Sequence, residues 1–301
     1  GKMKSLKILI TGITGFVGKH LSRRLLREGH NIFAIIRNPL IVDSLEAQGV
    51  KCFLDDNKTM DTLIKFFDDN KFDGVIHLAS KFVVEHKPED ILELINSNLL
   101  FSTRVLEASV KANVKWFINT GTFWQHYENR DYSPVNFYAA TKQAFEAIAQ
   151  YYLETTNINF VTLKLNDTYG PEDTRPKIFN LWLKIAGTSE TLDMSAGEQL
   201  IDIVYIDDVV EAYVKAIELL ENDNDKKLKG SSFAVSSGKP VKLKELAKIF
   251  EEVTGKKLNI NWGKRLYRKR EVMVPWNKGQ TLPNWKPTIT IEEGIKRICD
   301  V

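Results

Sequence analysis

Short runs of apolar and β-branched residues alternate with amphipathic stretches through the first half of the chain. The apolar runs predict strands that are covered on both faces, at residues 6–10, 31–36, 51–54, 74–78, 116–119 and 160–165. Apolar positions three and four residues apart predict helices, at residues 18–28, 91–112 and 137–155. This alternation predicts right-handed βαβ units, and therefore an α/β fold with a Rossmann-type, doubly wound parallel sheet.

The pattern changes after the Tyr169-Gly170-Pro171 turn, where prolines and glycines become spaced and the periodicity weakens. Residues 203–206, followed by a helix at 207–221, predict a return of the chain to the sheet. A further helix is predicted at 243–254. We therefore expect two parts: a Rossmann domain of residues 3–170 and 200–236, and a smaller, discontinuous C-terminal substrate region of residues 171–199 and 237–301.

Composition and charge narrow the class of protein further. Of 301 residues, 43% are hydrophobic and 27% charged, and 42 Lys and Arg against 39 Asp and Glu leave a net charge of +3. Such an even balance does not indicate binding to nucleic acid or to an anionic membrane. Cys52 and Cys299 lie far apart and predict neither a disulfide framework nor a metal site. With no long apolar run or signal-type start, the sequence predicts a cytoplasmic globular protein.

Three glycines lie where the first strand is expected to turn into the first helix, in the run Thr11-Gly12-Ile13-Thr14-Gly15-Phe16-Val17-Gly18. Glycine permits a tight turn, lets backbone N–H groups approach a pyrophosphate, and lets the helix pack close to the strand. In this position the run predicts a dinucleotide site. Its expected cofactor contacts are Gly12, Thr14, Gly15, Phe16, Val17 and Gly18.

The end of the second predicted strand indicates which dinucleotide is bound. An NAD site usually has Asp or Glu there to accept a hydrogen bond from the ribose 2′-hydroxyl, whereas this strand is followed by Arg37. Arg37 can pair with a 2′-phosphate through charge-assisted hydrogen bonds, so NADP(H) is favoured over the alternative, NAD(H). A solvated surface charge is the other interpretation of Arg37. Asp55 or Asp56 is a candidate acceptor from the adenine amino group, or a plain turn residue.

Tyr138 and Lys142 are four residues apart in a strongly helical segment, so both project from one face of the helix. A phenol titrates near 10 and is a poor acid–base group at neutral pH unless its anion is favoured. An ammonium one helical turn away favours the phenolate. The pair is therefore a candidate proton-transfer site, and Lys142 is also a candidate ligand for ribose hydroxyls.

Together, the glycine loop and this pair resemble the extended short-chain dehydrogenase/reductase family of nucleotide-sugar epimerases, dehydratases and ketoreductases. The G-x-x-G-x-x-G spacing is similar to that branch, and the resemblance runs over essentially the whole chain. Further matching segments are His77-Leu78-Ala79-Ser80, Asn98, residues 163–171, residues 202–209, and Trp285-Lys286-Pro287. The resemblance implies an NAD(P)-dependent oxidoreductase that acts on a nucleotide sugar, commonly as a homodimer. It adds Leu78, Ala79, Ser80, Asn98, Tyr138 and Lys142 to the cofactor contacts.

The family's third catalytic group is a Ser or Thr at the end of the fifth strand. An ungapped alignment of residues 114–122 places it at Thr122, with Thr120 as the alternative. The resemblance implies that this hydroxyl binds the substrate oxygen and orients it toward the hydride.

Departures from the family pattern narrow the reaction. The sugar 4,6-dehydratases of the family carry Asp-Glu directly after the catalytic threonine, whereas Phe123 and Trp124 stand here, so dehydration is disfavoured. Asp167 replaces an asparagine that contacts the sugar in the family. Two reactions remain: reduction of a 4-keto sugar nucleotide by NADPH, and 4-epimerisation with a tightly held NAD⁺. Arg37 favours reduction.

Residues 120–126 and 136–142 are similar to the 4-ketoreductases that make CDP-3,6-dideoxyhexoses (CDP-abequose or CDP-paratose) for surface polysaccharides. This closer resemblance implies that Trp124 and His126 line the sugar pocket. Asp167 is a further candidate for substrate binding, from its place in the wider family pattern. Packing for Trp124 and a surface loop for His126 are the alternatives. In the basic run at 264–270, Arg268 or Arg270 is implied as a clamp for the nucleotide diphosphate, whereas a charge run is more often a solvated loop.

An NADP-binding, redox-sensing regulator on the same fold is the competing, non-enzymatic class. Relatives of that kind tend to keep the glycine loop and to lose the Tyr–Lys pair. Because Tyr138 and Lys142 are both present, the sequence favours an enzyme.

Overall fold

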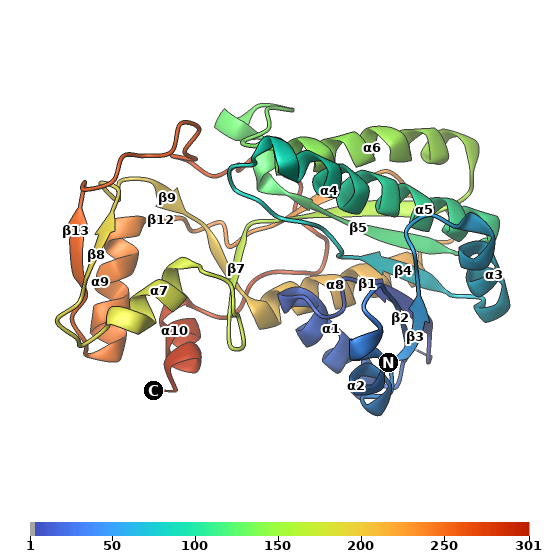
Figure 1. Ribbon diagram of the computed structural model, residues 1–301, viewed down its shortest axis with the longest axis horizontal. Coiled ribbons are helices and arrows are strands. Elements are labelled where there is room, and N and C mark those ends of the chain that lie inside the picture. The colour runs from blue at the N-terminus through green and yellow to red at the C-terminus, as the bar shows by residue number, and fades with distance from the viewer. Residues whose placement is uncertain (1–3, 301) are drawn as a thin grey trace.

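The computed structural model describes residues 4–300 of the chain, and a seven-stranded parallel sheet forms its centre (Figure 1). The strand order is β11-β6-β5-β4-β1-β2-β3, so the chain starts in the middle of the sheet and is wound outward in both directions. The strands are β1 (Lys7–Thr11), β2 (Asn31–Ile36), β3 (Lys51–Leu54), β4 (Gly74–His77), β5 (Trp116–Thr122), β6 (Asn159–Leu165) and β11 (Ser232–Val235). The predicted Rossmann-type fold is confirmed.

Helices cover both faces of this sheet, each over its own hydrophobic core (Figure 1). One core lies under α1 (Phe16–Arg27), α2 (Val42–Ala47) and α8 (Ile206–Glu221), and is filled by side chains such as Ile8, Leu21 and Val209. The other lies under α3 (Met60–Asn70), α5 (Phe101–Lys111) and α6 (Phe137–Thr155), and includes Leu9, Phe67 and Phe117. Consecutive residues of β1 therefore serve opposite cores, as the pleat of a doubly covered strand requires.

The helix predicted at 91–112 is one continuous helical segment with a local irregularity. It consists of α4 (Ile91–Ile95), a π-helical turn (Asn96–Leu100) and α5. A π-helical turn widens the helix by one residue and often accompanies a functional site. Here it contains Asn98, which is buried.

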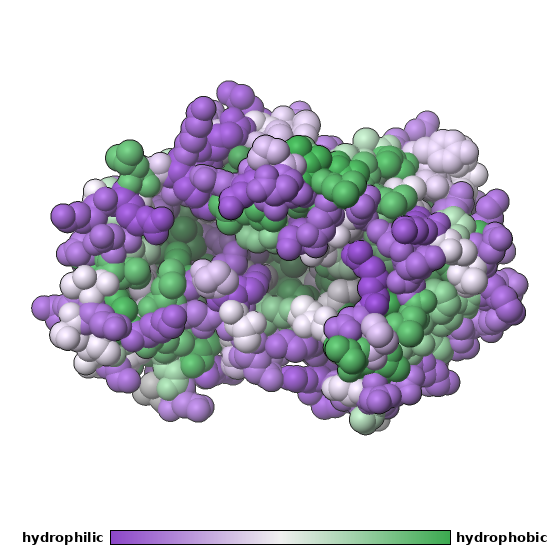
Figure 2. All heavy atoms as spheres, viewed as in Figure 1, coloured by the Kyte–Doolittle hydropathy of each residue, from purple (hydrophilic) through white to green (hydrophobic). Residues whose placement is uncertain are grey.

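A smaller part, to the left of the sheet in Figure 1, is made by segments from the second half of the chain. It contains the helices α7 (Ile178–Ile185), α9 (Leu243–Thr254) and α10 (Ile291–Cys299). This part also contains two short strand pairs: β8 (Thr191–Met194) with β13 (Asn259–Trp262), and β9 (Leu200–Ile201) with β12 (Val241–Lys242). Figure 2 shows the surface hollowed between this part and the sheet.

The predicted return of residues 203–206 to the main sheet is wrong. The strand there, β10 (Ile203–Tyr205), pairs with β7 (Asp167–Tyr169) in a separate two-stranded sheet. The seventh strand of the main sheet is instead β11, which follows α8 and pairs with β6. A run of three buried residues fits either sheet, since burial alone does not specify the hydrogen-bonded neighbour.

Within residues 4–300, no helix is both long enough and apolar enough to cross a membrane.

Candidate active site

The glycine loop joins β1 to α1 and fits a bound pyrophosphate. Gly12 has a φ of +69°, and a Cβ there would lie 2.6 Å from the backbone nitrogen of Ala79. A Cβ on Gly18 would lie 2.2 Å from the carbonyl oxygen of Gly12. Gly15 is the N-cap of α1. The first turn of this helix, which lies within the described residues, contains neither Asp nor Glu. The positive end of the helix dipole therefore faces the loop without a competing carboxylate, which suits an anionic group.

Hydrogen bonds connect the carboxyl ends of β1 and β4, next to the glycine loop. His77 is buried between two hydroxyl groups, with Nδ1 2.7 Å from Thr11 Oγ1 and Nε2 2.7 Å from Ser102 Oγ. Burial, with a smaller effect of the Lys142 charge, lowers the pKa of His77 to about 3, so its ring is neutral. Thr11 Oγ1 also accepts from the backbone N–H groups of Leu78 and Ala79, at 3.0 and 3.1 Å. The residues predicted from the glycine loop and from 77–80 thus come together.

Arg37 is exposed directly after β2, at the same sheet edge as the glycine loop. Its Nη2 donates to Ser97 Oγ at 3.3 Å, which is a weak restraint on a long side chain. Within residues 4–300, no carboxylate lies within ion-pair distance of this guanidinium. Arg37 therefore has hydrogen-bonding capacity left for a phosphate.

The two aspartates proposed for the adenine group both have protein partners. Asp55 is buried, and the Arg104 guanidinium donates a bidentate pair of hydrogen bonds to its two carboxylate oxygens, at 2.7 and 3.0 Å. Asp56 accepts from the backbone N–H groups of Lys58 and Thr59, at 2.7 and 2.8 Å, and from the Thr59 hydroxyl. Those hydrogen bonds lower the pKa of Asp56 well below its usual range. Both carboxylates thus order the segment between β3 and α3.

Tyr138 and Lys142 lie on the first turns of α6, next to the carboxyl end of β5. The Lys142 Nζ lies 5.8 Å from the centroid of the Tyr138 ring. Burial raises the pKa of Tyr138 to about 12, against opposing effects of a hydrogen bond with Ser80 and of the Arg175 charge. Burial lowers the pKa of Lys142 to about 8, opposed by Glu146. At neutral pH the phenol is therefore protonated and the amine is still a cation. The expected shift of Tyr138 toward its phenolate is not found, because burial outweighs the charges near the ring.

Of the two threonines at the end of β5, Thr122 has the hydroxyl better suited to a ligand. Its Oγ1 accepts from the backbone N–H of Trp124 at 3.2 Å, which leaves the hydroxyl proton available for donation. The Thr120 hydroxyl lies 2.6 Å from the Tyr213 hydroxyl on α8 and is buried there.

Asn98 holds protein segments together with both of its amide atoms. Its Oδ1 accepts from the backbone N–H of Lys81 at 2.7 Å, and its Nδ2 donates to the Lys81 carbonyl at 2.9 Å. Nδ2 also lies 3.0 Å from Thr141 Oγ1 on α6. Asn98 thus fixes the loop after β4 relative to the helix that carries Tyr138.

An aromatic pair lies beside Tyr138. The Phe82 ring meets the Tyr138 ring edge to face, with centroids 4.9 Å apart, and lies 5.8 Å from the Trp124 ring. The Arg268 guanidinium lies over the Trp124 ring at 5.3 Å, and the Lys177 Nζ over the Phe82 ring at 4.8 Å. Trp124 and Arg268, from the predicted substrate set, therefore meet near Tyr138.

Asp167 lies in the same charged neighbourhood. Burial raises the pKa of Asp167, while the charges of Lys177, Arg175 and Arg268 oppose the rise and that of Asp202 adds to it. Burial also lowers the pKa of Lys177, against the attraction of Asp167. The site thus combines one desolvated carboxylate with several cations, and its positive balance suits an anionic ligand.

His126 is committed to the protein. Its Nε2 lies 2.8 Å from the Lys164 Nζ, and its Nδ1 lies 3.0 Å from the carbonyl oxygen of Arg130. Its ring stacks on Trp276, with centroids 4.1 Å apart. Because an ammonium only donates, Nε2 is the accepting nitrogen and Nδ1 carries the proton. Both ring nitrogens of His126 are therefore used within the protein.

Arg270 has a different environment from Arg268. Its Nε donates to the Pro134 carbonyl at 3.1 Å, its Nη2 donates to Ser133 Oγ at 2.9 Å, and its guanidinium lies over the Tyr127 ring at 4.2 Å. Arg270 thus fastens the loop before α6, and Arg268 is the one of the two that lies near Tyr138 and Asp167.

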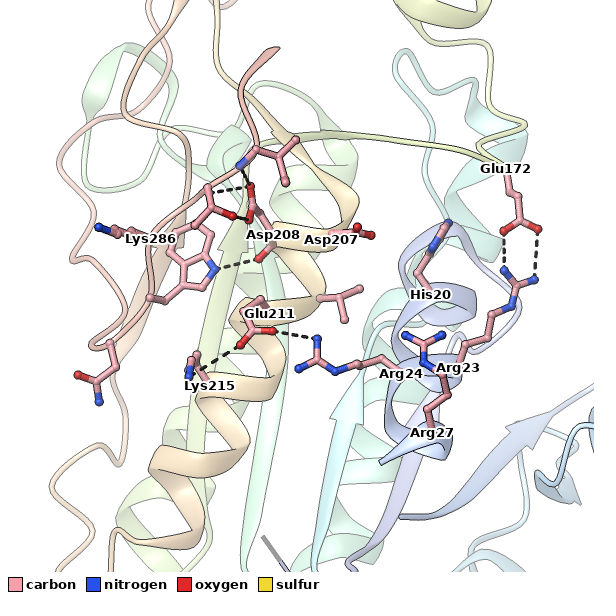
Figure 3. A pocket seen from close by; sticks show the side chains of 15 residues that line it. His20, Arg23, Arg24, Arg27, Glu172, Asp207, Asp208, Glu211, Lys215 and Lys286 are labelled. Carbon is pink, nitrogen blue, oxygen red and sulfur yellow. Dashed lines mark hydrogen bonds and ion pairs between the residues drawn. The ribbon is translucent and has the colours of Figure 1, made fainter. Parts of the chain in front are cut away.

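A groove of about 640 Å³ between α1, α8 and residues 284–289 lies apart from these groups (Figure 3). Its charges pair across the opening, with Arg23 bound to Glu172 and Arg24 to Glu211 at 2.9 Å. Neither the glycine loop nor Tyr138 lines it. This groove therefore does not contain the candidate cofactor-binding and proton-transfer groups.

Sequence reasoning missed several residues that surround Tyr138. Phe82, Arg175 and Lys177 lie in irregular segments, and long-range packing brings them together, so no local spacing reveals them. The N-cap role of Asn136 could have been predicted, since Asn directly before a predicted helix favours an N-cap. Its Oδ1 accepts from the backbone N–H of Ala139 at 2.9 Å.

Comparison with known proteins agrees with this geometry. The model of the NAD dependent epimerase/dehydratase family matches residues 8–228. The CDP-abequose synthase of Salmonella muenchen is 30% identical over 302 residues, covering 98% of this chain and 97% of that protein. The UDP-glucuronate 4-epimerase of Thermodesulfobacterium geofontis is 26% identical over 316 residues, covering 96% and 94%.

Solved structures show the same fold. The UDP-glucose 4-epimerase of Thermotoga maritima, in a structure with UDP-glucose, superimposes with a TM-score of 0.82 at 22% identity and covers 98% of each chain. The likeness extends over the sheet and the smaller part alike.

Proposed function

The chain belongs to the NAD dependent epimerase/dehydratase family, and from that premise we propose that it reduces a nucleotide-activated 4-keto-deoxysugar with NADPH. The family membership makes it a nucleotide-sugar-modifying enzyme with an NAD(P) cofactor. The finer proposal is the reduction of a CDP-4-keto-3,6-dideoxyhexose, in the formation of a surface-polysaccharide precursor. It rests chiefly on a protonated phenol, Tyr138, held beside a buried cation, Lys142.

The proton chemistry follows from those two groups. When bound, the nicotinamide ring supplies the hydride that reaches C4 of the sugar. The Tyr138 hydroxyl donates its proton to the C4 oxygen, so that the ketone becomes an alcohol. Lys142 stabilises the phenolate left behind, which regains a proton from water. Thr122 donates a hydrogen bond to the same sugar oxygen and orients it.

The direction of the reaction is inferred from the cofactor side. Arg37 has capacity for the 2′-phosphate that distinguishes NADP(H), and a carboxylate at its place would repel that group. An exchangeable NADPH suits net reduction, because each turnover consumes one reduced cofactor. The similarity to CDP-abequose synthases from three sources supports the same direction.

The two parts of the molecule receive separate roles in this proposal. Residues 3–170 and 200–236 hold the cofactor, and residues 171–199 and 237–301 hold the nucleotide sugar. Lys177 and Arg268 belong to the second part and lie near Asp167 and the aromatic pair beside Tyr138. Their charges suit the diphosphate of the sugar nucleotide.

The second candidate is a 4-epimerase, favoured by the 26% identity to a UDP-glucuronate 4-epimerase. A panel assay separates the two reactions. We expect the absorbance of NADPH to fall with a CDP-4-keto-3,6-dideoxyhexose and to stay constant with UDP-sugars. Interconversion of UDP-sugars without added cofactor, together with constant absorbance for every keto sugar, would establish the epimerase instead.

A further inference from the structure

We propose that Phe82 determines which sugars this site reduces, by placing an apolar wall beside Tyr138 that favours a deoxygenated carbon next to the keto group. The inference rests on the proposed ketoreductase function and assigns to Phe82 and Trp124 the choice between a CH₂ and a CHOH group at that carbon.

Phe82 is placed to meet substrate. It is 41% exposed, a high value for a phenylalanine whose ring packs against the ring of Tyr138, the proposed proton donor. Its ring lies 4.9 Å from the Tyr138 ring and 5.8 Å from the Trp124 ring, so it touches both the proton donor and the residue two positions after Thr122. A sugar whose C4 oxygen reaches Tyr138 therefore has its neighbouring carbons close to these rings.

Two asparagines hold the Phe82 segment in place. Asn98 bonds to both the N–H and the carbonyl of Lys81, at 2.7 and 2.9 Å. Asn136 Nδ2 donates to the carbonyls of Val83 and Val84, at 3.1 and 3.0 Å. The backbone is therefore fastened on both sides of Phe82. Because Asn136 is also the N-cap of α6, the Phe82 loop and the Tyr138 helix share one anchor.

Cations further restrain the two rings. The Lys177 Nζ lies 4.8 Å over the Phe82 ring, and the Arg268 guanidinium lies 5.3 Å over the Trp124 ring. Cation–π contacts of this kind favour one ring orientation. A ring that is fixed at its backbone and over its face cannot turn aside for a larger or more polar substrate.

The selectivity follows from what the Phe82 ring lacks. A phenylalanine ring offers neither a donor nor an acceptor in its plane, so a sugar hydroxyl buried against it loses its hydrogen bonds to water. Apolar pockets reject an isostere with one added hydroxyl by about 100-fold at most. We therefore expect a preference of about 10- to 100-fold in kcat/KM for the deoxygenated sugar.

The test measures kcat/KM with NADPH for CDP-4-keto-3,6-dideoxyhexose and for CDP-4-keto-6-deoxyhexose, which keeps the 3-hydroxyl. Both sugars use the same Tyr138 and the same cofactor, so a general loss of activity cancels in the ratio of the two values. Phe82→Gln is expected to lower this ratio at least tenfold. Phe82→Leu, which keeps an apolar side chain, is expected to retain most of it.

Two further variants separate placement from stability. Asn136→Asp keeps the accepting oxygen that caps α6 but loses the amide that donates to Val83 and Val84, so it is expected to lower the ratio while the helix stays capped. Leu92→Gln, at a 72% exposed position on α4, is the control and is expected to leave the ratio unchanged.

The possible results distinguish failure of the specificity role of Phe82 from failure of the proposed function. If the unmodified enzyme reduces both sugars equally, or if Phe82→Gln keeps the wild-type ratio, the specificity role is wrong while the ketoreductase function stands. If neither sugar is reduced, the proposed function falls and the specificity role falls with it.

Discussion

Burial shifts the pKa values of Tyr138 and Lys142 in opposite directions, because it disfavours the charged form of each group. A phenol with a raised pKa is protonated at neutral pH but is also a weaker acid, so proton donation depends on the Lys142 cation stabilising the phenolate as it forms. The cation beside it is retained at a cost in folding free energy, since a buried ammonium loses its hydration. Site chemistry and stability are thus opposed at Lys142.

That opposition gives a pH-dependent prediction. The pKa of Lys142 is about 8 in the folded protein against 10.5 in the unfolded chain. Between these values the unfolded chain binds more protons, so the contribution of Lys142 to stability is unfavourable below pH 8 and its cost disappears as the pH rises toward 10.5. Lys142→Met is therefore expected to be more stable than wild type at pH 7 by about 2 to 3 kcal/mol.

Urea unfolding at pH 7 and at pH 10 measures this difference. The gain of the variant should shrink at the higher pH, because the wild-type amine is then neutral. Other groups that titrate in the window are common to both proteins and cancel. An equal gain at both pH values would show that the effect is packing and not the buried charge.

Arg37 carries the second prediction at this scale. Arg37→Ala is expected to raise KM for NADPH by about 10- to 100-fold, because a hydrogen bond to a charged group contributes about 1.5 to 3 kcal/mol. KM for NADH should change little, since NADH has no 2′-phosphate. Arg27→Ala removes an exposed guanidinium from the far end of α1 and is the control. Equal changes in KM for both cofactors would contradict the role given to Arg37.

Local spacing made part of the site predictable. Gly12, Gly18, Tyr138 and Lys142 are each defined by neighbours a few residues away, so the sequence identifies them without a fold. Phe82 differs, because its position depends on Asn98 and Asn136 from other parts of the chain. No periodicity in the sequence contains that information.

At the scale of elements, prediction succeeded where the pattern was long. The helix expected at 137–155 and the one at 243–254 coincide with α6 and α9, and the strand at 31–36 coincides with β2. The error at residues 203–206 has a physical cause. Three buried residues define a strand but not its neighbour, and β7 was available to pair with it outside the main sheet.

The turn from β1 to α1 gives a prediction about packing between elements. In Gly18→Ala the new methyl group would lie 2.2 Å from the Gly12 carbonyl oxygen and 2.8 Å from Ile13 Cα. The helix must therefore shift, at a cost of about 1 to 3 kcal/mol in the free energy of unfolding. Gly15→Ala is the matched control, since its methyl group would lie 3.3 Å from the same Gly12 carbonyl oxygen, which needs only a small shift, and its φ is −72°.

Urea unfolding of the two variants compares them directly. Gly15→Ala should lose less than about 1 kcal/mol, in the range of an ordinary surface change. If Gly18→Ala were as stable as Gly15→Ala, the close approach of α1 to β1 would be no constraint on this turn.

At the scale of the whole molecule, one carboxylate joins the C-terminal segment to helix α8. Asp208, on the first turn of α8, accepts from the backbone N–H groups of Thr288 and Ile289, at 3.0 and 2.9 Å, and from the Thr288 hydroxyl at 3.1 Å. Its own carbonyl accepts from the indole N–H of Trp285 at 2.9 Å. The smaller part of the molecule is therefore tied to α8 at a buried point.

Asp208→Ala is expected to lower the free energy of unfolding by about 2 to 4 kcal/mol, because the Asp208 carboxylate is buried and its loss leaves two partly buried backbone N–H groups without their acceptor. The neighbouring Asp207→Ala removes only a partly exposed ion pair with Arg297, at 3.2 Å, and should cost less than about 1 kcal/mol. Equal losses in the two variants, measured by thermal or urea unfolding, would refute this role of Asp208.

The central claim is that hydride passes from NADPH to C4 of the sugar and stays there. The most direct measurement uses NADPH that carries deuterium on one or the other face of C4 of its nicotinamide, with CDP-4-keto-3,6-dideoxyhexose. We predict that one of the two labelled cofactors places one deuterium on the sugar for each NADP⁺ formed, and that Tyr138→Phe slows this transfer by about 100-fold or more. Recovery of the keto sugar without deuterium at C4, with either labelled cofactor and with no NADPH consumed, would contradict the account.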